Sequence, residues 1–254
     1  MENIKPKIFI FTTCYRSMTS MQYTVSLLKL ITFFNSKSIP FIIDFIGDEI
    51  IMDKIRNESI AKFMNSSCTH LLFINSDISF EIQAVMDLLL YDKDVVCCNC
   101  PEKKYNWEKI ADSIKNENNS IESIESRGIQ YSYIPIYDKE KQIIKNNNFI
   151  KVKYASADFM LIKKNIIERL WDKHQELMII CNNTNQNNNL IIGLFCSMIK
   201  GKDYLSGDYS FCERVNDIGG EIWMNINHNL NRLGENIFCS DIRNRNYLEI
   251  NEKE

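Results

Sequence analysis

Residues 69–80 read THLLFINSDISF, and this stretch decides the fold class of the chain. Its first part, His70 to Asn75, is rich in Leu, Ile and Phe, which is typical of a strand buried on both faces of a parallel sheet. Asp77 follows where that strand ends, and open α/β sheets bind their ligands outside the carboxyl ends of their strands. The stretch therefore predicts a central strand with a functional carboxylate at its end.

The same pattern recurs through the first hundred residues. Segments with apolar residues at three- and four-residue steps, the period of a helix packed on one face, alternate with short runs of Ile, Val and Phe. The runs predict further strands at Lys7 to Thr12, Phe41 to Ile46 and Asp94 to Cys98. Alternating strands and helices favour an α/β fold with a mixed, mainly parallel central sheet flanked by helices.

Residues 101–148 break this pattern. They are charged and rich in Asn and Ser, with isolated aromatic residues, which predicts a long surface loop or flap. A second polar tract follows at residues 182–189, and the chain ends in a polar tail. Ordered elements are expected again as strands at Phe149 to Lys153, Ala157 to Ile162 and Glu221 to Ile226, and as helices at Lys164 to His174 and Ser206 to Asp217.

Composition and charge exclude several classes of partner. The 254 residues are 45% hydrophobic, enough for one sizeable core, and 30 basic against 33 acidic side chains give a net charge of -3. This balance leaves no basic footprint for nucleic acid or an anionic membrane surface. No stretch approaches the roughly 20 apolar residues of a membrane span. The nine cysteines lie mostly inside apolar runs and suit reduced thiols, so we expect a cytoplasmic protein.

Three familiar kinds of site are not expected. Cys97, Cys98 and Cys100 form a cluster, but no second Cys or His pair follows at zinc-finger spacing. The turn after the first strand, residues 12–17 (TTCYRS), contains no glycine. A bulky turn cannot bring its backbone against phosphates, so dinucleotide-binding and P-loop sites are excluded as well.

Residues 56–63 (RNESIAKF) and 69–80 together resemble GT-A fold nucleotide-sugar glycosyltransferases, especially the giant-virus and phage type. The family pattern there is Arg-Asn, an amphipathic helix and a strand that ends in a DxD motif. Three later blocks agree with the family in the same order: residues 154–164 (YASADFMLIKK), 204–212 (YLSGDYSFC) and 220–223 (GEIW). The resemblance covers residues 7 to about 238, apart from residues 103–148 and the Asn-rich tract.

The resemblance implies a single GT-A (Rossmann-like) domain across residues 1–254, with a nucleotide-binding half at 1–100, a flexible excursion at 101–148 and an acceptor and catalytic half at 149–254. It implies transfer of a sugar from a nucleotide-sugar, with a UDP-sugar as the expected donor, to a hydroxyl on a glycan, protein or small molecule. For a viral protein the expected location is the host cytoplasm. The alternative function is a catalytically silent GT-A module that binds nucleotide or glycan.

The DxD-like segment here is Asn75, Ser76 and Asp77, and the resemblance assigns all three to the donor site. Asp77 is expected to hold Mn²⁺ or Mg²⁺ against the diphosphate, because hard cations prefer oxygen ligands; the alternative is an N-cap for the next helix. Asn75 lacks the charge of the usual first acid. Arg232 stands where the family often has a late His, and its guanidinium can neutralise a diphosphate directly. His228 is the other candidate metal ligand, the alternative being a structural or exposed histidine.

Asp208 takes the position of the catalytic carboxylate that removes a proton from the acceptor hydroxyl in inverting members of this fold. A carboxylate in the first turn of a helix is kept ionised by the free N–H groups and the helix dipole. The Glu that the family often has at the preceding position is Gly207 here. The alternative is ordinary helix capping by Ser206 or Asp208.

The turn after the first strand is where this family holds the base and ribose of the nucleotide. Thr13 and Tyr15 belong to that turn, and Tyr15 can stack on a pyrimidine. Arg16 or Arg56 can reach the diphosphate, while the alternative for Tyr15 and Arg16 is a solvated loop. Trp107 is the acceptor-side candidate because sugar rings stack on aromatic faces, and the alternative is a local hydrophobic anchor.

Overall fold

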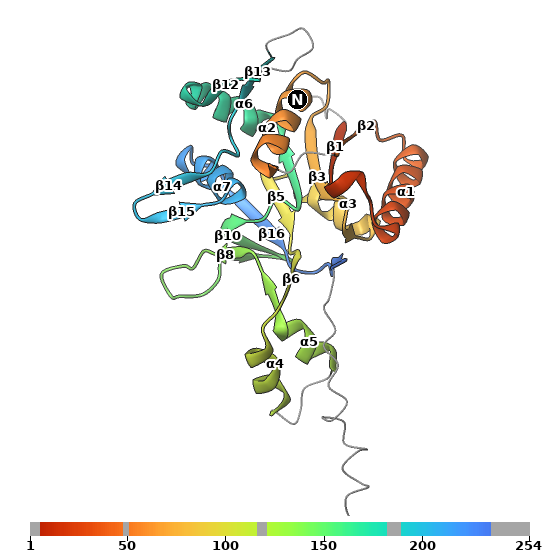
Figure 1. The fold of residues 1–254 in the computed structure, drawn as a ribbon, viewed down its shortest axis with the longest axis vertical. Coiled ribbons are helices and arrows are strands. Elements are labelled where there is room, and N and C mark those ends of the chain that lie inside the picture. The colour runs from red at the N-terminus through yellow and green to blue at the C-terminus, as the bar shows by residue number, and fades with distance from the viewer. Residues whose placement is uncertain (1–5, 48–50, 116–120, 182–188, 235–254) are drawn as a thin grey trace, which may run out of the picture.

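The computed structural model describes residues 6–47, 51–115, 121–181 and 189–234, so the polar tail and most of the Asn-rich tract lie outside the described residues. A nine-stranded sheet forms the centre, with the strand order β2-β1-β3-β11-β5-β16-β10-β8 and β9 paired with β10 (Figure 1). The strands are β1 (Ile8–Cys14), β2 (Phe41–Gly47), β3 (His70–Asn75), β5 (Val95–Cys98), β8 (Tyr133–Pro135), β9 (Lys145–Asn146), β10 (Phe149–Ala155), β11 (Phe159–Lys163) and β16 (Ile222–Asn225).

Most of the central strands of this sheet, namely β2, β1, β3, β5 and β16, run in one direction. β1 pairs in parallel with β2 and β3, and β16 pairs in parallel with β5. β11 lies antiparallel between β3 and β5, and β10 and β8 extend the sheet through antiparallel pairs. The predicted α/β fold with a mixed, mainly parallel central sheet flanked by helices is confirmed.

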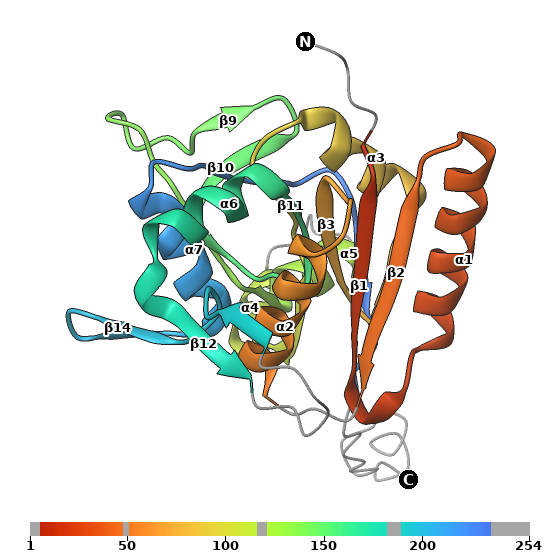
Figure 2. The same cartoon turned by 90° about the horizontal axis from the view of Figure 1, so that it is seen from above.

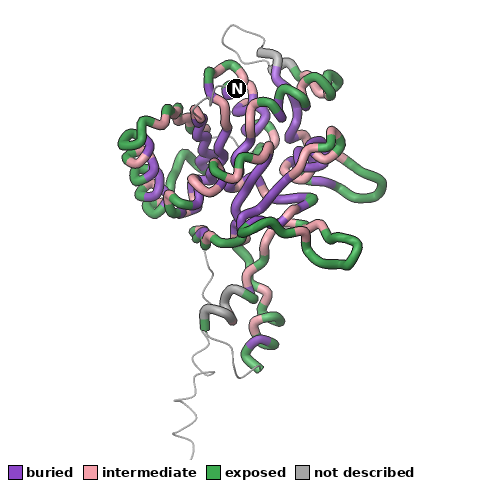
Figure 3. The backbone as a smooth tube through the Cα atoms, turned by 180° about the vertical axis from the view of Figure 1, so that it is seen from behind, coloured by how far each residue is buried: buried purple, intermediate pink, exposed green. Residues whose placement is uncertain are grey.

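Helices cover both faces of the sheet because successive strand side chains point to opposite sides. Ile8 and Ile10 of β1 belong to the core that packs on one face, whereas Phe9 and Phe11 belong to the core on the other. Buried residues follow the central strands in Figure 3. The helices on the Ile8 face are α1 (Met21–Ser36) and α3 (Ile82–Tyr91), and those on the Phe9 face are α2 (Met52–Met64), α6 (Lys164–Lys173) and α7 (Gly207–Asp217); Figure 2 shows α1 and α2 on opposite sides.

The segment expected to be a loop or flap has regular structure instead. β6 (Pro101–Tyr105) pairs with β7 (Ile129–Tyr131), and between them α4 (Trp107–Ile114) and α5 (Ile121–Gly128) project from the body of the molecule (Figure 1). Asn106, which reads as a loop residue, caps α4 by accepting a 3.0 Å hydrogen bond from the Lys109 N–H. A Cβ at Gly128 would lie 2.6 Å from Ile110 Cδ1, so glycine permits the close packing of α4 on α5.

Short strand pairs and 3-10 turns complete the fold. The most important pair joins β4 (Ile78–Ser79) to β17 (Asn231–Arg232), with Arg232 opposite Ile78. This pair brings a residue from the end of the described chain beside the end of β3. The remaining elements are the hairpins β12 (Met178–Cys181) with β13 (Asn189–Ile192) and β14 (Met198–Lys200) with β15 (Asp203–Leu205), and the turns η1 (Tyr15–Ser17) and η2 (Gln175–Leu177).

The cysteines whose side chains are described are free thiols. Burial raises the pKa of the Cys97, Cys98 and Cys100 thiols, which keeps them neutral and suits their role as small apolar side chains. Among the described helices, none is long and apolar enough to cross a bilayer.

Candidate functional site

A cleft of about 740 Å³ opens at the carboxyl ends of β1 and β3, where Thr13, Cys14 and Asn75 line it. Other segments of the chain contribute the rest of the lining, which comprises Tyr15, Met18, Thr19, Ser20, Met52, Asp53, Ile55, Arg56, Ser76, Asp77, Lys103, Asp158, Gly207, Asp208, Arg232, Leu233 and Gly234. The structure thus brings together every predicted donor-binding residue except Arg16, together with Asp208.

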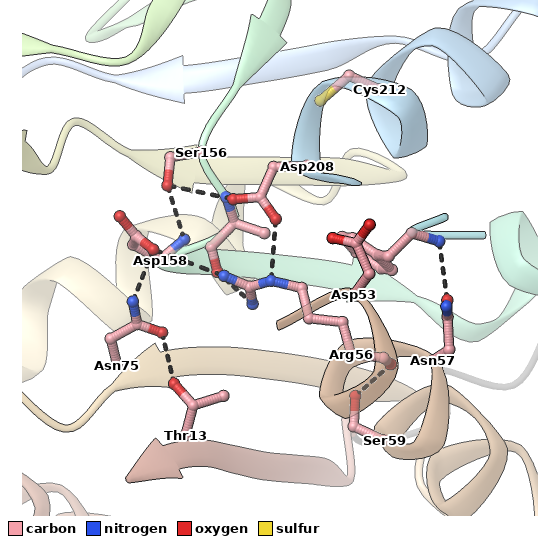
Figure 4. Close-up of polar contacts among 12 residues, drawn as sticks. Thr13, Asp53, Arg56, Asn57, Ser59, Asn75, Ser156, Asp158, Asp208 and Cys212 are labelled. Carbon is pink, nitrogen blue, oxygen red and sulfur yellow. Dashed lines mark hydrogen bonds and ion pairs between the residues drawn. The ribbon is translucent and has the colours of Figure 1, made fainter. Parts of the chain in front are cut away.

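Arg56 lies in the floor of the cleft and is only 2% exposed. Its Nε lies 2.9 Å from Asp208 Oδ1, and its Nη1 donates a 3.0 Å hydrogen bond to the Ala157 carbonyl (Figure 4). The guanidinium also lies over the rings of Phe73 and Phe195, at 4.9 and 5.7 Å from their centres. Arg56 is therefore fixed in place and positions the carboxylates around it.

Asp158 follows β10 and was not singled out from the sequence. Its Oδ1 accepts a 2.6 Å hydrogen bond from Asn75 Nδ2 and lies 3.5 Å from Arg56 Nη2. Its Oδ2 accepts a 2.8 Å hydrogen bond from Arg232 Nη1. Burial acts to raise the pKa of Asp158, but Arg232 and Arg56 outweigh it and hold this pKa below its ordinary value. Asp158 is thus a mostly buried, ionised carboxylate that joins two guanidinium groups.

Asp77 is held by two cations. Lys103 Nζ lies 2.7 Å and Arg232 Nε 3.1 Å from the same Asp77 oxygen, Oδ2. Burial opposes a charged guanidinium, yet Asp158 and Asp77 raise the pKa of Arg232 above its ordinary value. The alternative role for Asp77 as a helix N-cap is wrong, because α3 begins at Ile82 with Glu81 at its N-cap position.

These contacts form one continuous series across the cleft, which we call the ion-pair chain. In order, its members are Lys103, Asp77, Arg232, Asp158, Arg56 and Asp208. Three cations alternate with three carboxylates. Each buried charge therefore has a partner of opposite sign, as burial in a protein requires.

Asp208 lies in the first turn of α7 but does not cap it. Its Oδ2 accepts a 2.9 Å hydrogen bond from the Ala157 N–H, while Oδ1 faces Arg56. Ser206, at the N-cap position, makes no side-chain capping bond, so neither capping alternative explains these residues. Burial raises the pKa of Asp208, and Arg56 opposes that rise only in part. The sequence predicts that the N-terminus of α7 keeps Asp208 ionised. In the structure, burial and Arg56 have the largest effects on the pKa of Asp208.

Gly207 is glycine because another carboxylate occupies the space beside it. A Cβ at Gly207 would overlap Asp53 Oδ1 and lie 2.5 Å from the Phe195 carbonyl oxygen. Asp53 is held there by Ser197, whose N–H and hydroxyl donate to Asp53 Oδ2 at 3.1 and 2.7 Å. The space that a side chain at position 207 would need is thus filled by a carboxylate from α2, which no local sequence signal reveals.

In the turn after β1, Thr13 and Tyr15 line the cleft, whereas Arg16 does not. Thr13 Oγ1 donates a 2.9 Å hydrogen bond to Asn75 Oδ1, so these two predicted donor residues are connected. Tyr15 lines the cleft and is 65% exposed. Arg16 adopts a left-handed backbone conformation with φ 52° and lies outside the lining, at 5.2 Å from the Tyr15 ring centre.

Two predicted site residues lie elsewhere. His228 Nε2 lies 2.8 Å from Asp87 Oδ2 on α3. His228 lines a second cleft of about 510 Å³, which adjoins the main cleft at Lys103, Arg232 and Gly234. Trp107 is 71% exposed at the start of α4 and packs beside Tyr105 with ring centres 5.5 Å apart. The structure therefore brings neither the expected metal ligand His228 nor the expected acceptor residue Trp107 into the main cleft.

The residues around Asp77 do not fit a resident Mn²⁺ or Mg²⁺. Within residues 6–47, 51–115, 121–181 and 189–234, no group of three or more His, Cys, Asp or Glu side chains is arranged to hold a metal ion. Lys103 and Arg232 occupy the cation positions next to Asp77, and Asn75 is engaged by Thr13 and Asp158. The expected pairing of Asp77 with His228 around a metal is therefore not formed.

No protein-family model and no curated protein matches this chain. Among solved structures, GalNAc-T7 with UDP, GalNAc and Mn²⁺ is similar over 92% of this chain, with 5% identity and a TM-score of 0.42, and this chain spans only 45% of that one. A 4-diphosphocytidyl-2C-methyl-D-erythritol synthase from Anaerococcus prevotii DSM 20548 is similar over 84% of this chain and 99% of its own, with 9% identity and a TM-score of 0.34. Neither likeness assigns the chain to a family.

Proposed function

We propose that this protein is a glycosyltransferase that moves a sugar from a nucleotide-sugar, with a UDP-sugar as donor, to a hydroxyl acceptor. The observation that carries this proposal is the meeting of Asp208 with the guanidinium groups of Arg56 and Arg232 in one cleft at the carboxyl edge of the sheet. Guanidinium groups pair with phosphate oxygens, and a carboxylate can accept a proton. The GT-A-like sequence blocks support the same assignment.

The donor is expected to lie along the cleft from Tyr15 to Arg232. Tyr15, which is 65% exposed in the cleft lining, offers its aromatic ring to a nucleotide base. Thr13 and Asn75, hydrogen-bonded to each other, present polar groups below it for a ribose. In this proposal Thr13, Tyr15 and Asn75 form the nucleotide side of the cleft, and Asp158 and Asp208 lie near the reacting sugar.

Asp208 is the proposed base. As the acceptor oxygen attacks the anomeric carbon, the proton of that hydroxyl passes to the Asp208 carboxylate. The bond between the anomeric carbon and the diphosphate oxygen breaks, and the diphosphate leaves with the electron pair. A single displacement of this kind inverts the anomeric centre. The raised pKa of Asp208, caused by burial, makes it a stronger proton acceptor than an exposed carboxylate.

A thermal-shift series on the full chain tests the proposal. Nucleoside diphosphates and nucleotide-sugars that bind only the native state raise the unfolding temperature by mass action, by about 2.7 kcal/mol of stability at a hundredfold excess over Kd. We expect UDP and a UDP-sugar to give the shift. If no nucleoside diphosphate changes the unfolding temperature, the proposed function is wrong.

A second candidate is the catalytically silent module that binds nucleotide or glycan. The observation that favours it is that Asp77, Asp158 and Asp208 are each already paired with a cation. Both candidates predict nucleotide binding, so binding does not separate them. Release of UDP from a UDP-sugar, with an acceptor or with water, supports the transferase, whereas binding without any turnover supports the silent module.

A further inference from the structure

Two cations of the ion-pair chain share a single oxygen. Lys103 comes from β6 and Arg232 from β17, yet both approach Asp77 Oδ2, at 2.7 and 3.1 Å. Lys103 and Arg232 thus place two positive groups side by side at the cleft, although Asp77 and Asp158 balance their charge. Two adjacent cationic donors suit a ligand with more than one negative oxygen.

Arg232 is built into this position by the backbone. It lies opposite Ile78 in the β4 and β17 pair, and the next residue, Leu233, donates a 2.8 Å hydrogen bond from its N–H to the Asp77 carbonyl. Its side chain is 17% exposed, with Nε bonded to Asp77 and Nη1 to Asp158. Within the part of the chain that the structure describes, Nη2 has no partner, so this nitrogen can donate to a ligand without breaking either contact.

We infer that Lys103 and Arg232 bind the diphosphate of the donor directly. They neutralise the leaving group in place of a divalent cation, and this inference rests on the proposed function. The planar guanidinium is held on two sides and suits bidentate contact with phosphate, while the half-exposed Lys103 can follow the ligand on its flexible stem. A divalent cation beside Asp77 would instead lie close to two positive groups and be repelled by both.

The inference assigns a distinct role to Asp77. Its carboxylate orients Lys103 and Arg232, but its negative charge opposes the phosphates. Asp77→Asn keeps an oxygen acceptor for both cations and removes that charge. Because unit charges about 4 Å apart interact by about 1 kcal/mol in water, the variant should bind diphosphate about fivefold more tightly in EDTA. If Asp77 were a metal ligand, Asp77→Asn would instead bind diphosphate more weakly in Mn²⁺.

Isothermal titration of the full chain with UDP and with inorganic pyrophosphate, in EDTA and in Mn²⁺, tests the inference. We expect both ligands to bind in EDTA with Kd within about threefold of the Mn²⁺ value. Lys103→Gln and Arg232→Gln should each weaken binding roughly tenfold in EDTA, as expected for loss of a charge-assisted hydrogen bond. Lys104→Gln is the matched control, since Lys104 lines the other cleft only, and should change Kd less than twofold.

The outcomes separate this inference from the proposed function. Binding of UDP in Mn²⁺ that is lost in EDTA overturns the inference and leaves the proposed function in place. Weaker binding by Asp77→Asn in EDTA also overturns it. Absence of UDP binding in both conditions contradicts the proposed function and the inference together. If Arg232→Gln fails to fold, the exposed Lys103→Gln variant and Asp77→Asn still decide the result.

Discussion

The Nε of Arg56 lies 2.9 Å from the Oδ1 of Asp208, and this pair ties α2 to the first turn of α7 beneath the cleft. The arginine is 2% exposed and also reaches Asp158 and the Ala157 carbonyl. A buried cation in this position is retained only because several acceptors surround it. The pair therefore links the stability of the fold to the arrangement of the carboxylates.

Replacement of Arg56 by Met should destabilise the protein strongly. The change leaves Asp208 buried without its cation, and breaking a buried pair in this way typically costs about 3–5 kcal/mol. Urea unfolding of both proteins measures the difference in free energy. Lys62→Met on the same helix is the control, because Lys62 and its partner Asp44 are 49% and 29% exposed and such surface pairs contribute less than about 1 kcal/mol. Equal losses for both variants would show that Arg56 has no special structural role.

Gly207→Ala should also destabilise, through steric overlap with Asp53 and the Phe195 carbonyl. Overpacking of this kind costs about 1–3 kcal/mol. Asp53→Ala should relieve part of the loss in the double variant, because the Asp53 side chain is one of the two groups in the way. Ser206→Ala serves as control, since Ser206 makes no side-chain cap bond and its loss should change stability little. If the losses in free energy of unfolding simply add in the double variant, Gly207→Ala does not act through contact with Asp53.

The sequence located one side of the cleft because strand ends are visible locally. The apolar run before Asn75 and the one before Thr13 place both residues at the carboxyl edge of neighbouring strands, and the structure joins them by a hydrogen bond. Parallel strands share that edge, so their end residues meet whatever the intervening sequence. The fold class and the meeting of Thr13 with Asn75 at this edge could therefore be predicted from the sequence.

The sequence did not predict Asp158, Asp53 or Lys103 in the cleft, because their contacts depend on long-range packing. Asp158 stands 74 positions from Arg232 along the chain, and their pairing depends on β17 joining β4. Asp53 reaches α7 only because α2 and α7 pack on the same face of the sheet. Lys103 lay in the segment interpreted as a loop, where the Asn and Ser content concealed β6 and two short helices.

His70 should make the stability of the fold depend on pH. Burial, and then Lys163 opposite it in the sheet, lower the pKa of His70 to about 4 from 6.5. Between these values the unfolded chain binds more protons than the folded one, so the free energy of unfolding falls as pH falls, by at most about 1.4 kcal/mol per pH unit. In His70→Gln, this part of the pH dependence of the free energy of unfolding should be absent. Urea unfolding of both proteins from about pH 7 to about pH 4 measures it, and parallel pH profiles would contradict the assignment.

Tyr15→Ala should weaken UDP binding roughly tenfold, because base stacking on an aromatic ring contributes about 1–3 kcal/mol. Tyr15→Phe keeps the ring and should bind like the wild type. Tyr204→Ala is the matched control, since Tyr204 is 73% exposed on β15 and lies outside the cleft lining. Titration of the three variants with UDP gives the comparison. A similar Kd for Tyr15→Ala and Tyr204→Ala would exclude Tyr15 from the donor site.

Asp208→Asn should separate binding from chemistry. The amide keeps the shape of the carboxylate and an oxygen acceptor for the Ala157 N–H, so the Kd for UDP-sugar should stay within about threefold. It cannot take the proton of the acceptor hydroxyl, so acceptor-dependent turnover should fall by about 10²-fold or more, mainly in kcat. Asp53→Asn is the matched control, because Asp53 lines the same cleft but is held by Ser197, and its turnover should fall far less. Wild-type turnover by Asp208→Asn would show that another group is the base, and a loss of folding stability without a loss of kcat would assign Asp208 a structural role.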